Sequence, residues 1–204
     1  PQPRVSQDVP HLQLSEEAVL SSNQLVLRLA RQTETALKSI RYLGPLREAP
    51  QRLYWAAGEL PQDVGLAGED TLAVMWGAHG SREGREIENK VSMWMDKFHV
   101  ASKVRLKVIS VPYFHLLFTD PHTGVAVNLA EVGFGASQVL PVIVQGYYSP
   151  PQSTLLVEQP EIHLHPRAQS TLADLLVDIA KGGRKLLVET HSEHLLYRLQ
   201  RRIA

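Results

Sequence analysis

The side chains best suited to chemistry lie in the last third of the chain, in the segment TLLVEQPEIHLHP, residues 154–166. Its apolar run, residues 155–157, is too short for a free-standing helix and is bounded by Ser/Thr and Pro, so we predict a buried strand. The polar side chains that follow this strand are Glu158, Gln159, Glu161, His163 and His165. In open α/β sheets the carboxyl ends of the strands are where ligands bind. The segment therefore predicts a site at the end of this strand.

A second apolar strand is predicted at residues 184–189, and it leads into Thr190 and His191. Between the two strands, Pro166 can occupy the first turn of a helix that runs to about Ala180, where its missing N–H costs nothing. Another helix begins after Ser192. The order helix, strand, helix, strand, helix is typical of parallel α/β topology, so the two polar strand ends are expected to converge.

A glycine-containing loop, residues 133–138, precedes an apolar helix predicted at residues 139–147. Unpaired N–H groups at a helix start suit a phosphate group. A carboxylate such as Glu158 suits a hydrated magnesium ion, which prefers oxygen ligands and keeps waters. With His191 at the neighbouring strand end, these parts together indicate phosphoryl transfer by positioning and electrostatics.

The same region supports a different enzyme class, a metal-dependent hydrolase. Histidine and carboxylate side chains can hold zinc or a metal pair. The candidate ligands are Glu158, Glu161, His163, His165, His191 and His194. Against this alternative, Pro166 makes the preceding residues a turn into a helix, in which His163 and His165 need not point the same way.

Composition excludes several classes of protein and site. The 204 residues include 21 Lys plus Arg and 21 Asp plus Glu, a balance that gives no support for bulk binding to nucleic acid. The absence of cysteine excludes disulfides and thiolate chemistry. No apolar run approaches the length that crosses a bilayer, and no signal peptide is present, so we predict a soluble, cytoplasmic protein without a membrane partner.

The rest of the chain predicts a mixed architecture. Residues 1–13 suggest a linker, and helices are expected at residues 20–40, 70–76 and 85–98, with a flexible turn at residues 77–84. Strands are expected at residues 41–46, from 103, at 113–119 and at 125–129, the last two joined by a turn that ends in Gly124. We predict three parts: a linker and helical segment at 1–39, a helical and β-hairpin region at 40–130, and a parallel α/β region at 131–204.

Four segments in order, GFGASQ, LLVEQPE, IHLHP and ETHSEHL, resemble the signature, Walker B, D-loop and switch-histidine segments of an ABC-type nucleotide-binding core. The resemblance is to AAA-family ATPases of the OLD and SMC/RecF group, and it covers residues 131–204. It implies a partial P-loop NTPase core, with the region before it as an insertion. Residues 42–48, YLGPLRE, are also similar to bacterial members of the group, with no role assigned.

The resemblance implies ATP and Mg²⁺ as cofactors and gives each motif residue a role. Glu158 would direct the magnesium ion and His191 would face the γ-phosphate. Gly135, Ser137 and Gln138 would contact nucleotide bound to a partner subunit. Gln159 stands where a catalytic glutamate is usual, and an amide cannot take a proton from water. Three explanations stay open: Glu161 substitutes, hydrolysis is slow, or the glutamine is an engineered trap.

The chain has no G-x-x-x-x-G-K-[S/T] phosphate loop, so the resemblance implies part of a longer ATPase, which alone would be inactive. The complete protein is expected to dimerise or form a higher oligomer through nucleotide and to act with an effector nuclease or a partner protein. A role in DNA metabolism or phage defence follows from resemblance only. A non-catalytic dimerising module is the third alternative. The candidate DNA contacts at the end of the chain are Arg198, Arg201 and Arg202.

Overall fold

The structure, a computed structural model, describes residues 16–56 and 59–203, and the chain divides into two compact units, residues 1–38 and 39–204. The first unit contains α1 (Glu16–Lys38), whose side chains are exposed from residue 23 onward. This helix confirms the one predicted at residues 20–40 and begins four residues earlier. The linker expected at residues 1–13 lies outside the described residues.

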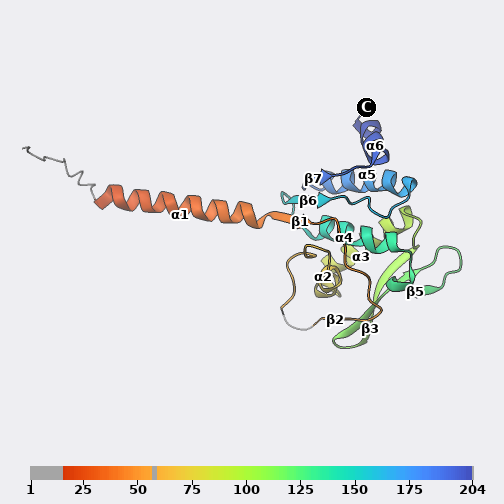
Figure 1. The fold of residues 1–204 in the computed structure, drawn as a ribbon. Helices are drawn as coiled ribbons and strands as arrows, with labels where there is room; N and C mark the ends of the chain where they lie inside the picture. Colours follow the sequence, from red (N-terminus) through yellow and green to blue (C-terminus); the bar gives the residue numbers. More distant parts are fainter. Residues whose placement is uncertain (1–15, 57–58, 204) are drawn as a thin grey trace, which may run out of the picture. The chain divides into compact units, whose positions relative to one another are not determined.

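In the second unit, three parallel strands form the sheet that carries the polar segment (Figure 1). They are β1 (Ile40–Leu43), β6 (Thr154–Glu158) and β7 (Lys185–Glu189), in the order β1-β6-β7. Glu158 is the register partner of Glu189, so the two strands end side by side. This confirms the predicted parallel α/β fold and the convergence of the two strand ends.

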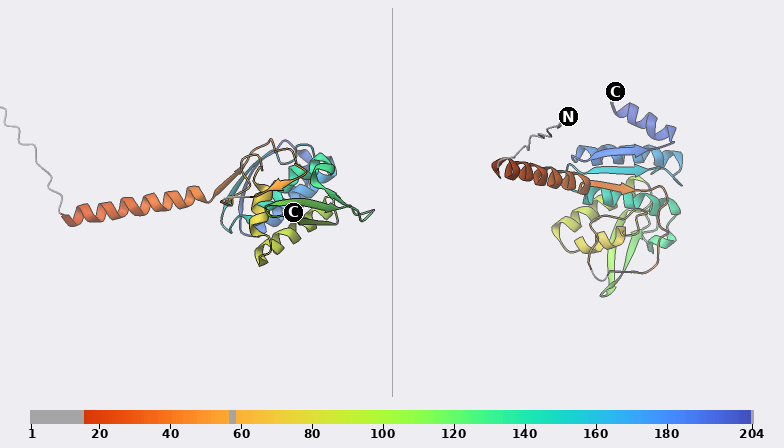
Figure 2. Two further views of the ribbon diagram at one scale, coloured as in Figure 1. Left: turned by 90° about the horizontal axis from the view of Figure 1, so that it is seen from below. Right: turned by 60° about the vertical axis from the view of Figure 1, so that its left-hand side comes forward.

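Helix α4 (Phe134–Tyr148) is the centre of the core, because every residue from 136 to 146 is buried. A helix that is apolar all round must be covered on all sides. On one side of it lie the parallel strands and α5 (Pro166–Lys181), and on the other side lie α2 (Thr71–Ala78) and α3 (Arg82–Lys97) (Figures 1 and 2). The chain ends on α6 (Glu193–Ile203), which packs against α5.

A second sheet is antiparallel and is built around β4 (Tyr113–Thr119). One edge of β4 pairs with β3 (Lys103–Ser110), and the other edge pairs with β2 (Tyr54–Trp55) and β5 (Ala126–Asn128). The predicted turn between β4 and β5 is confirmed, with the N–H of Asp120 donating to the carbonyl of Val125 and Gly124 at a φ of 70°. The inward side chains of β3 and β4 join the same hydrophobic core as α4.

The turn predicted at residues 77–84 is present but shorter, at residues 79–81 between α2 and α3. Helix α3 begins at Arg82, because the hydroxyl of Ser81 accepts a hydrogen bond from the N–H of Gly84 at 2.9 Å and caps the helix. Gly84 lies in the first turn of this helix, and a Cβ at this position would come within 1.9 Å of the carbonyl oxygen of Ala78. The glycine therefore permits a close approach of two backbone segments. No helix in the described part of the chain is long and apolar enough to cross a bilayer.

Candidate functional site

The site is built on the carboxyl ends of β6 and β7. Both strands alternate between an inner face packed on the helices and an outer face, and Glu158 and Glu189 share the outer face. Just after β6, the N–H of Gln159 donates to the carbonyl of Glu189 at 2.8 Å. The backbone hydrogen bonding between the two strands therefore continues one residue past the end of β6. Glu158 and His191, which were predicted to act together, are thus attached to neighbouring backbone.

Tyr42 on β1 is a direct partner of Glu158. Its hydroxyl donates to Oε1 of Glu158 at 2.8 Å, across 116 residues of sequence. The pKa of Tyr42 is raised, mainly because this bond needs the phenolic proton, then by burial and by the negative charges of Glu158 and Glu189. One oxygen of the Glu158 carboxylate is therefore oriented by the third strand of the sheet.

Arg47 lies beneath the same strand end. It is 9% exposed, and its Nη2 donates to the backbone carbonyl of Glu158 at 3.4 Å. Its Nε and Nη1 have no hydrogen-bond partner among the described residues. Burial lowers the pKa of Arg47 to about 10, opposed by Tyr42 and Glu158. A buried, incompletely paired guanidinium is costly, which is typical of a functional position rather than a structural one.

Tyr42 and Arg47 belong to the YLGPLRE segment, to which the sequence assigned no role. The parallel pairing of β1 with β6 brings this segment to Glu158. Alternation along a four-residue strand is too short to show which face Tyr42 occupies. One feature of the sequence could have indicated a role for this segment. The predicted strand ends at Gly44-Pro45, and polar residues just after the end of a parallel strand lie at the carboxyl edge of the sheet, where ligands bind.

The loop after β6 has two residues with positive φ, Gln159 at 42° and His163 at 62°. Non-glycine residues in this region are uncommon and concentrate at functional sites. The turn is closed by the N–H of Ile162, which donates to the carbonyl of Gln159 at 3.2 Å. Gln159 thus leaves the strand in a sharp bend, with its side chain half-buried beside Glu158.

Glu161 points back into the protein. It is 8% exposed, and its Oε1 accepts a hydrogen bond from the backbone N–H of His191 at 2.7 Å, while Oε2 has no partner among the described residues. Glu161 therefore connects the loop after β6 to the loop after β7. This geometry makes it a positioning residue for His191 and gives no direct support to its expected role as a substitute base.

His191 is exposed and stands just before α6. The next residue, Ser192, caps that helix, because its hydroxyl accepts from the N–H of Leu195 at 3.0 Å and donates to the side-chain oxygen of Gln169 at 2.7 Å. The backbone on both sides of His191 is therefore fixed, while its side chain is exposed to solvent.

The expected phosphate-facing loop at residues 133–138 is helical instead. Helix α4 begins at Phe134, and only Gly133, Phe134 and, in part, Gly135 of this segment are accessible to solvent. Ser137 is 6% exposed and donates to the carbonyl of Phe134 at 2.7 Å, and Gln138 is 4% exposed. The helix begins earlier than predicted because its first turn packs against the loop after β6. A Cβ on Gly135 would lie 3.2 Å from Cδ2 of Leu164.

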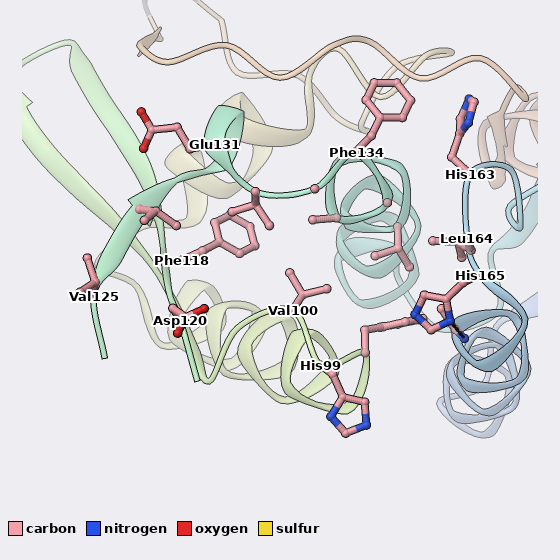
Figure 3. A pocket seen from close by; sticks show the side chains of 18 of the residues that line it. His99, Val100, Phe118, Asp120, Val125, Glu131, Phe134, His163, Leu164 and His165 are labelled. Atoms are coloured by element: carbon pink, nitrogen blue, oxygen red, sulfur yellow. Dashed lines mark hydrogen bonds between the residues drawn. The ribbon is translucent and has the colours of Figure 1, made fainter. Parts of the chain in front are cut away.

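An open pocket of about 760 Å³ is lined on one side by the end of α3 and the β4–β5 turn and on the other by the start of α4 and the loop after β6 (Figure 3). The rings of Phe134 and His163 meet edge to face at its rim, with centroids 4.9 Å apart. His165, also at the rim, accepts from the N–H of Ala168 through Nδ1 at 3.2 Å and caps α5. The two histidines therefore have structural roles at the junction of α4 and α5.

The arrangement gives no support to the metal-hydrolase alternative. Within residues 16–56 and 59–203, no three His, Cys, Asp or Glu side chains are grouped to hold a metal ion. Glu161 and His165 are bound to backbone N–H groups. Among the residues that the structure describes, only Oε1 of Glu158 has a hydrogen-bond partner, and a single carboxylate with waters and phosphates is a donor set that fits Mg²⁺.

The basic end of the chain is largely neutralised. Asp174 on α5 forms ion pairs with Arg198 at 2.9 Å and with Arg202 at 3.1 Å. These arginines therefore fix α6 on α5, and only Arg201 of the predicted cluster lacks an ion pair among the described residues.

The sequence of the chain matches one protein-family model. Residues 28–196 match the family described as "AAA domain, putative AbiEii toxin, Type IV TA system". No curated protein sequence matches the chain.

Among solved structures, the SMC head bound to the C-winged helix domain of ScpA has a TM-score of 0.48 and 14% identity, over 63% of this chain and 43% of that one. An SMC ATPase from a study of ATP-driven dimerisation and DNA-stimulated activation has a TM-score of 0.47 and 15% identity, over 56% and 72%. The SMC head domain from Thermotoga maritima has a TM-score of 0.43 and 9% identity, over 68% and 50%. The chain thus spans less than half of the first of these structures.

The family match covers most of the chain and includes β1, β6 and β7 with their polar ends. It confirms the resemblance to an ABC-type AAA-family ATPase core that the four motifs indicated. The chain belongs to the AAA-domain family.

Proposed function

We propose that residues 39–204 form the part of an ATP-hydrolysing core that holds the magnesium ion and senses the γ-phosphate. The observation that carries the proposal is the placement of Glu158 and His191 at the ends of neighbouring parallel strands, in a chain of the AAA-domain family. Tyr42 orients one oxygen of Glu158 and leaves the other for the metal.

In this proposal ATP and Mg²⁺ are the cofactors, and each residue has a defined task. Mg²⁺, when bound, neutralises charge on the β- and γ-phosphates. Glu158 would hold the metal through its hydration shell, and the exposed imidazole of His191 would donate to the γ-phosphate. Gln159 cannot accept a proton, but its amide can orient the attacking water, as a glutamine does in some GTPases. Hydrolysis then depends on positioning, which predicts slow turnover.

The phosphate loop would come from sequence that this chain does not contain, so the activity belongs to the complete gene product. There the accessible start of α4, from Gly133 to Gly135, would meet the nucleotide of a second subunit, because helix N-termini favour phosphate. Nucleotide-dependent dimerisation, an effector nuclease or partner protein, and action on DNA remain parts of the proposal.

The test is ATP turnover by the complete gene product and its variants His191→Ala and Gln159→Glu. Loss of the imidazole donor is expected to lower kcat about 10²- to 10³-fold. A carboxylate at position 159 supplies a base and is expected to raise kcat, by up to about 10²-fold. His194→Ala, an exposed neighbour on α6, is the matched control. Equal rates in all proteins would refute the assignment and favour a non-catalytic dimerising module.

A further inference from the structure

The outer face of the antiparallel sheet carries a row of cations. Lys103, Arg105 and Lys107 occupy alternate positions of β3, and all three are exposed, while Val104 and Leu106 between them are buried. Alternation sends the three cations to one face at spacings of about 6.6 Å. None of the ion pairs found in the described residues involves these cations.

The same face carries exposed aromatic rings. Trp55 on β2 is 66% exposed and is the register partner of Tyr113 on β4, which is 44% exposed. The adjacent pair, Tyr54 and Phe114, turns inward, and their rings stack with centroids 6.0 Å apart. Trp55 and Tyr113 therefore point away from the core, side by side.

The aromatic and basic groups belong to one continuous surface. Along β4 the outward residues after Tyr113 are His115 and Leu117, which pair across the ladder with Lys107 and Arg105. His115 is held in place, because its Nδ1 lies 2.6 Å from the carbonyl of Arg52. The nearby acidic groups are engaged elsewhere: Glu131 pairs with Arg52 at 3.0 Å, and Asp120 accepts from the backbone of its own turn.

We propose that this face, defined by Trp55, Tyr113, Lys103, Arg105 and Lys107, binds single-stranded nucleic acid. A row of cations neutralises the phosphates of the backbone, and aromatic rings on a sheet stack against unpaired bases. A duplex does not offer such bases, because it keeps them inside its helix. The surface is distinct from the predicted basic end of α6, where Asp174 pairs with two of the arginines. It is independent of the proposed ATPase site.

The first experiment measures fluorescence anisotropy of a fluorescein-labelled 20-nucleotide oligothymidylate titrated with the 204-residue chain. Binding is expected, with a slope of log K against log salt of about −2 for three phosphate contacts. Trp55→Ala is expected to weaken binding about 5- to 150-fold through loss of one stacked base. Absence of binding at low salt overturns the proposal.

The second experiment separates this surface from general charge. The triple variant Lys103→Gln, Arg105→Gln, Lys107→Gln is expected to abolish most of the salt dependence. The matched control is the triple variant Lys181→Gln, Lys185→Gln, Arg201→Gln, which removes the same charge from exposed positions on α5, β7 and α6. This control is expected to retain the salt dependence of binding. Equal loss in both triple variants, with unchanged thermal unfolding, overturns the proposal.

The third experiment identifies the kind of partner by tryptophan fluorescence. Trp94 is 1% exposed and Trp76 is half-buried, so quenching by oligothymidylate reports on Trp55. Trp55→Phe is expected to keep most of the affinity and lose most of the quenching. Tighter binding to a duplex of the same length, insensitive to Trp55→Ala, overturns the single-stranded assignment. Displacement by polyglutamate as effective as by oligothymidylate overturns it in favour of an acidic protein.

Discussion

The carboxylate of Glu161 holds the backbone N–H of His191 at 2.7 Å, although 30 residues separate them. The bond joins the loop after β6, which bends at Gln159, to the loop after β7. A displacement of either loop therefore moves the other, and the position of His191 depends on a buried acid rather than on its own side-chain contacts.

Glu161→Ala is expected to destabilise the protein by about 1 kcal/mol, because it removes the acceptor of the hydrogen bond from the N–H of His191. Glu161→Gln retains an acceptor oxygen and is expected to stay within about 1 kcal/mol of the parent protein. Urea denaturation of the 204-residue chain gives both values. If Glu161 instead serves as the proton acceptor in the complete gene product, Glu161→Gln will abolish ATP turnover at unchanged stability.

Tyr42→Phe removes the donor to Glu158 and leaves the ring in place. Outer-shell partners of metal ligands are worth about 10- to 100-fold in metal affinity or activity. We expect the Mg²⁺ concentration for half-maximal ATP turnover by the complete gene product to rise by that factor. Tyr197→Phe, on an exposed position of α6, is the control. An unchanged Mg²⁺ dependence would show that the bond to Glu158 has no part in metal binding.

Arg47→Met separates stability from function. The guanidinium is buried, and two of its nitrogens have no partner within residues 16–56 and 59–203, so an apolar side chain of similar length is expected to leave stability unchanged or raise it by about 1–2 kcal/mol. Activity of the complete gene product is expected to fall, as is usual where a strained site is relaxed. A large loss of stability would instead identify Arg47 as a structural anchor for the carbonyl of Glu158.

Asp178 on α5 joins three helices and predicts a pH dependence. Tyr147 on α4 donates to it, Lys90 on α3 lies 3.5 Å away, and Trp94 donates to Tyr147 at 2.6 Å. The bond from Tyr147 and the charge of Lys90 lower the pKa of Asp178 below its usual 3.8, despite partial burial.

Since the folded state favours the carboxylate, its contribution to stability is complete above the unfolded pKa and is lost as pH falls through the lower folded pKa. Asp178→Asn is expected to cost about 1 kcal/mol at pH 7, because solvent screens this half-exposed group. The difference should be constant above about pH 5 and shrink below about pH 4. Asp96→Asn, exposed on α3, is the control. A difference independent of pH would show that the carboxylate charge is unimportant.

The parallel sheet and its polar ends were predictable because they depend on local patterns. Short apolar runs predicted β6 and β7, and Pro166 predicted the start of α5. The start of α4 and the start of α3 were not predictable, since each depends on a distant or capping contact, Gly135 against Leu164 and Ser81 to Gly84. The separation of residues 40–130 from 131–204 stays a prediction.

The candidate site was predicted in part. Glu158 and His191 follow strands and could be placed from the sequence, whereas Tyr42 and Arg47 reach Glu158 only through the pairing of β1 with β6, which is a long-range contact. The burial of Ser137 and Gln138 was missed because a GFGASQ sequence does not show how many of its residues the helix includes.

The shared register of Glu158 and Glu189 determines which form of a nucleotide can approach. The two carboxylates belong to adjacent strands, whose backbones lie roughly 4.8 Å apart, so they concentrate negative charge on the outer face, while the guanidinium of Arg47 next to Glu158 is buried. Polyphosphate without a cation is repelled by this face, whereas a divalent ion is attracted to it. The metal is therefore expected to arrive already attached to the nucleotide, and its charge admits the phosphates to the strand ends.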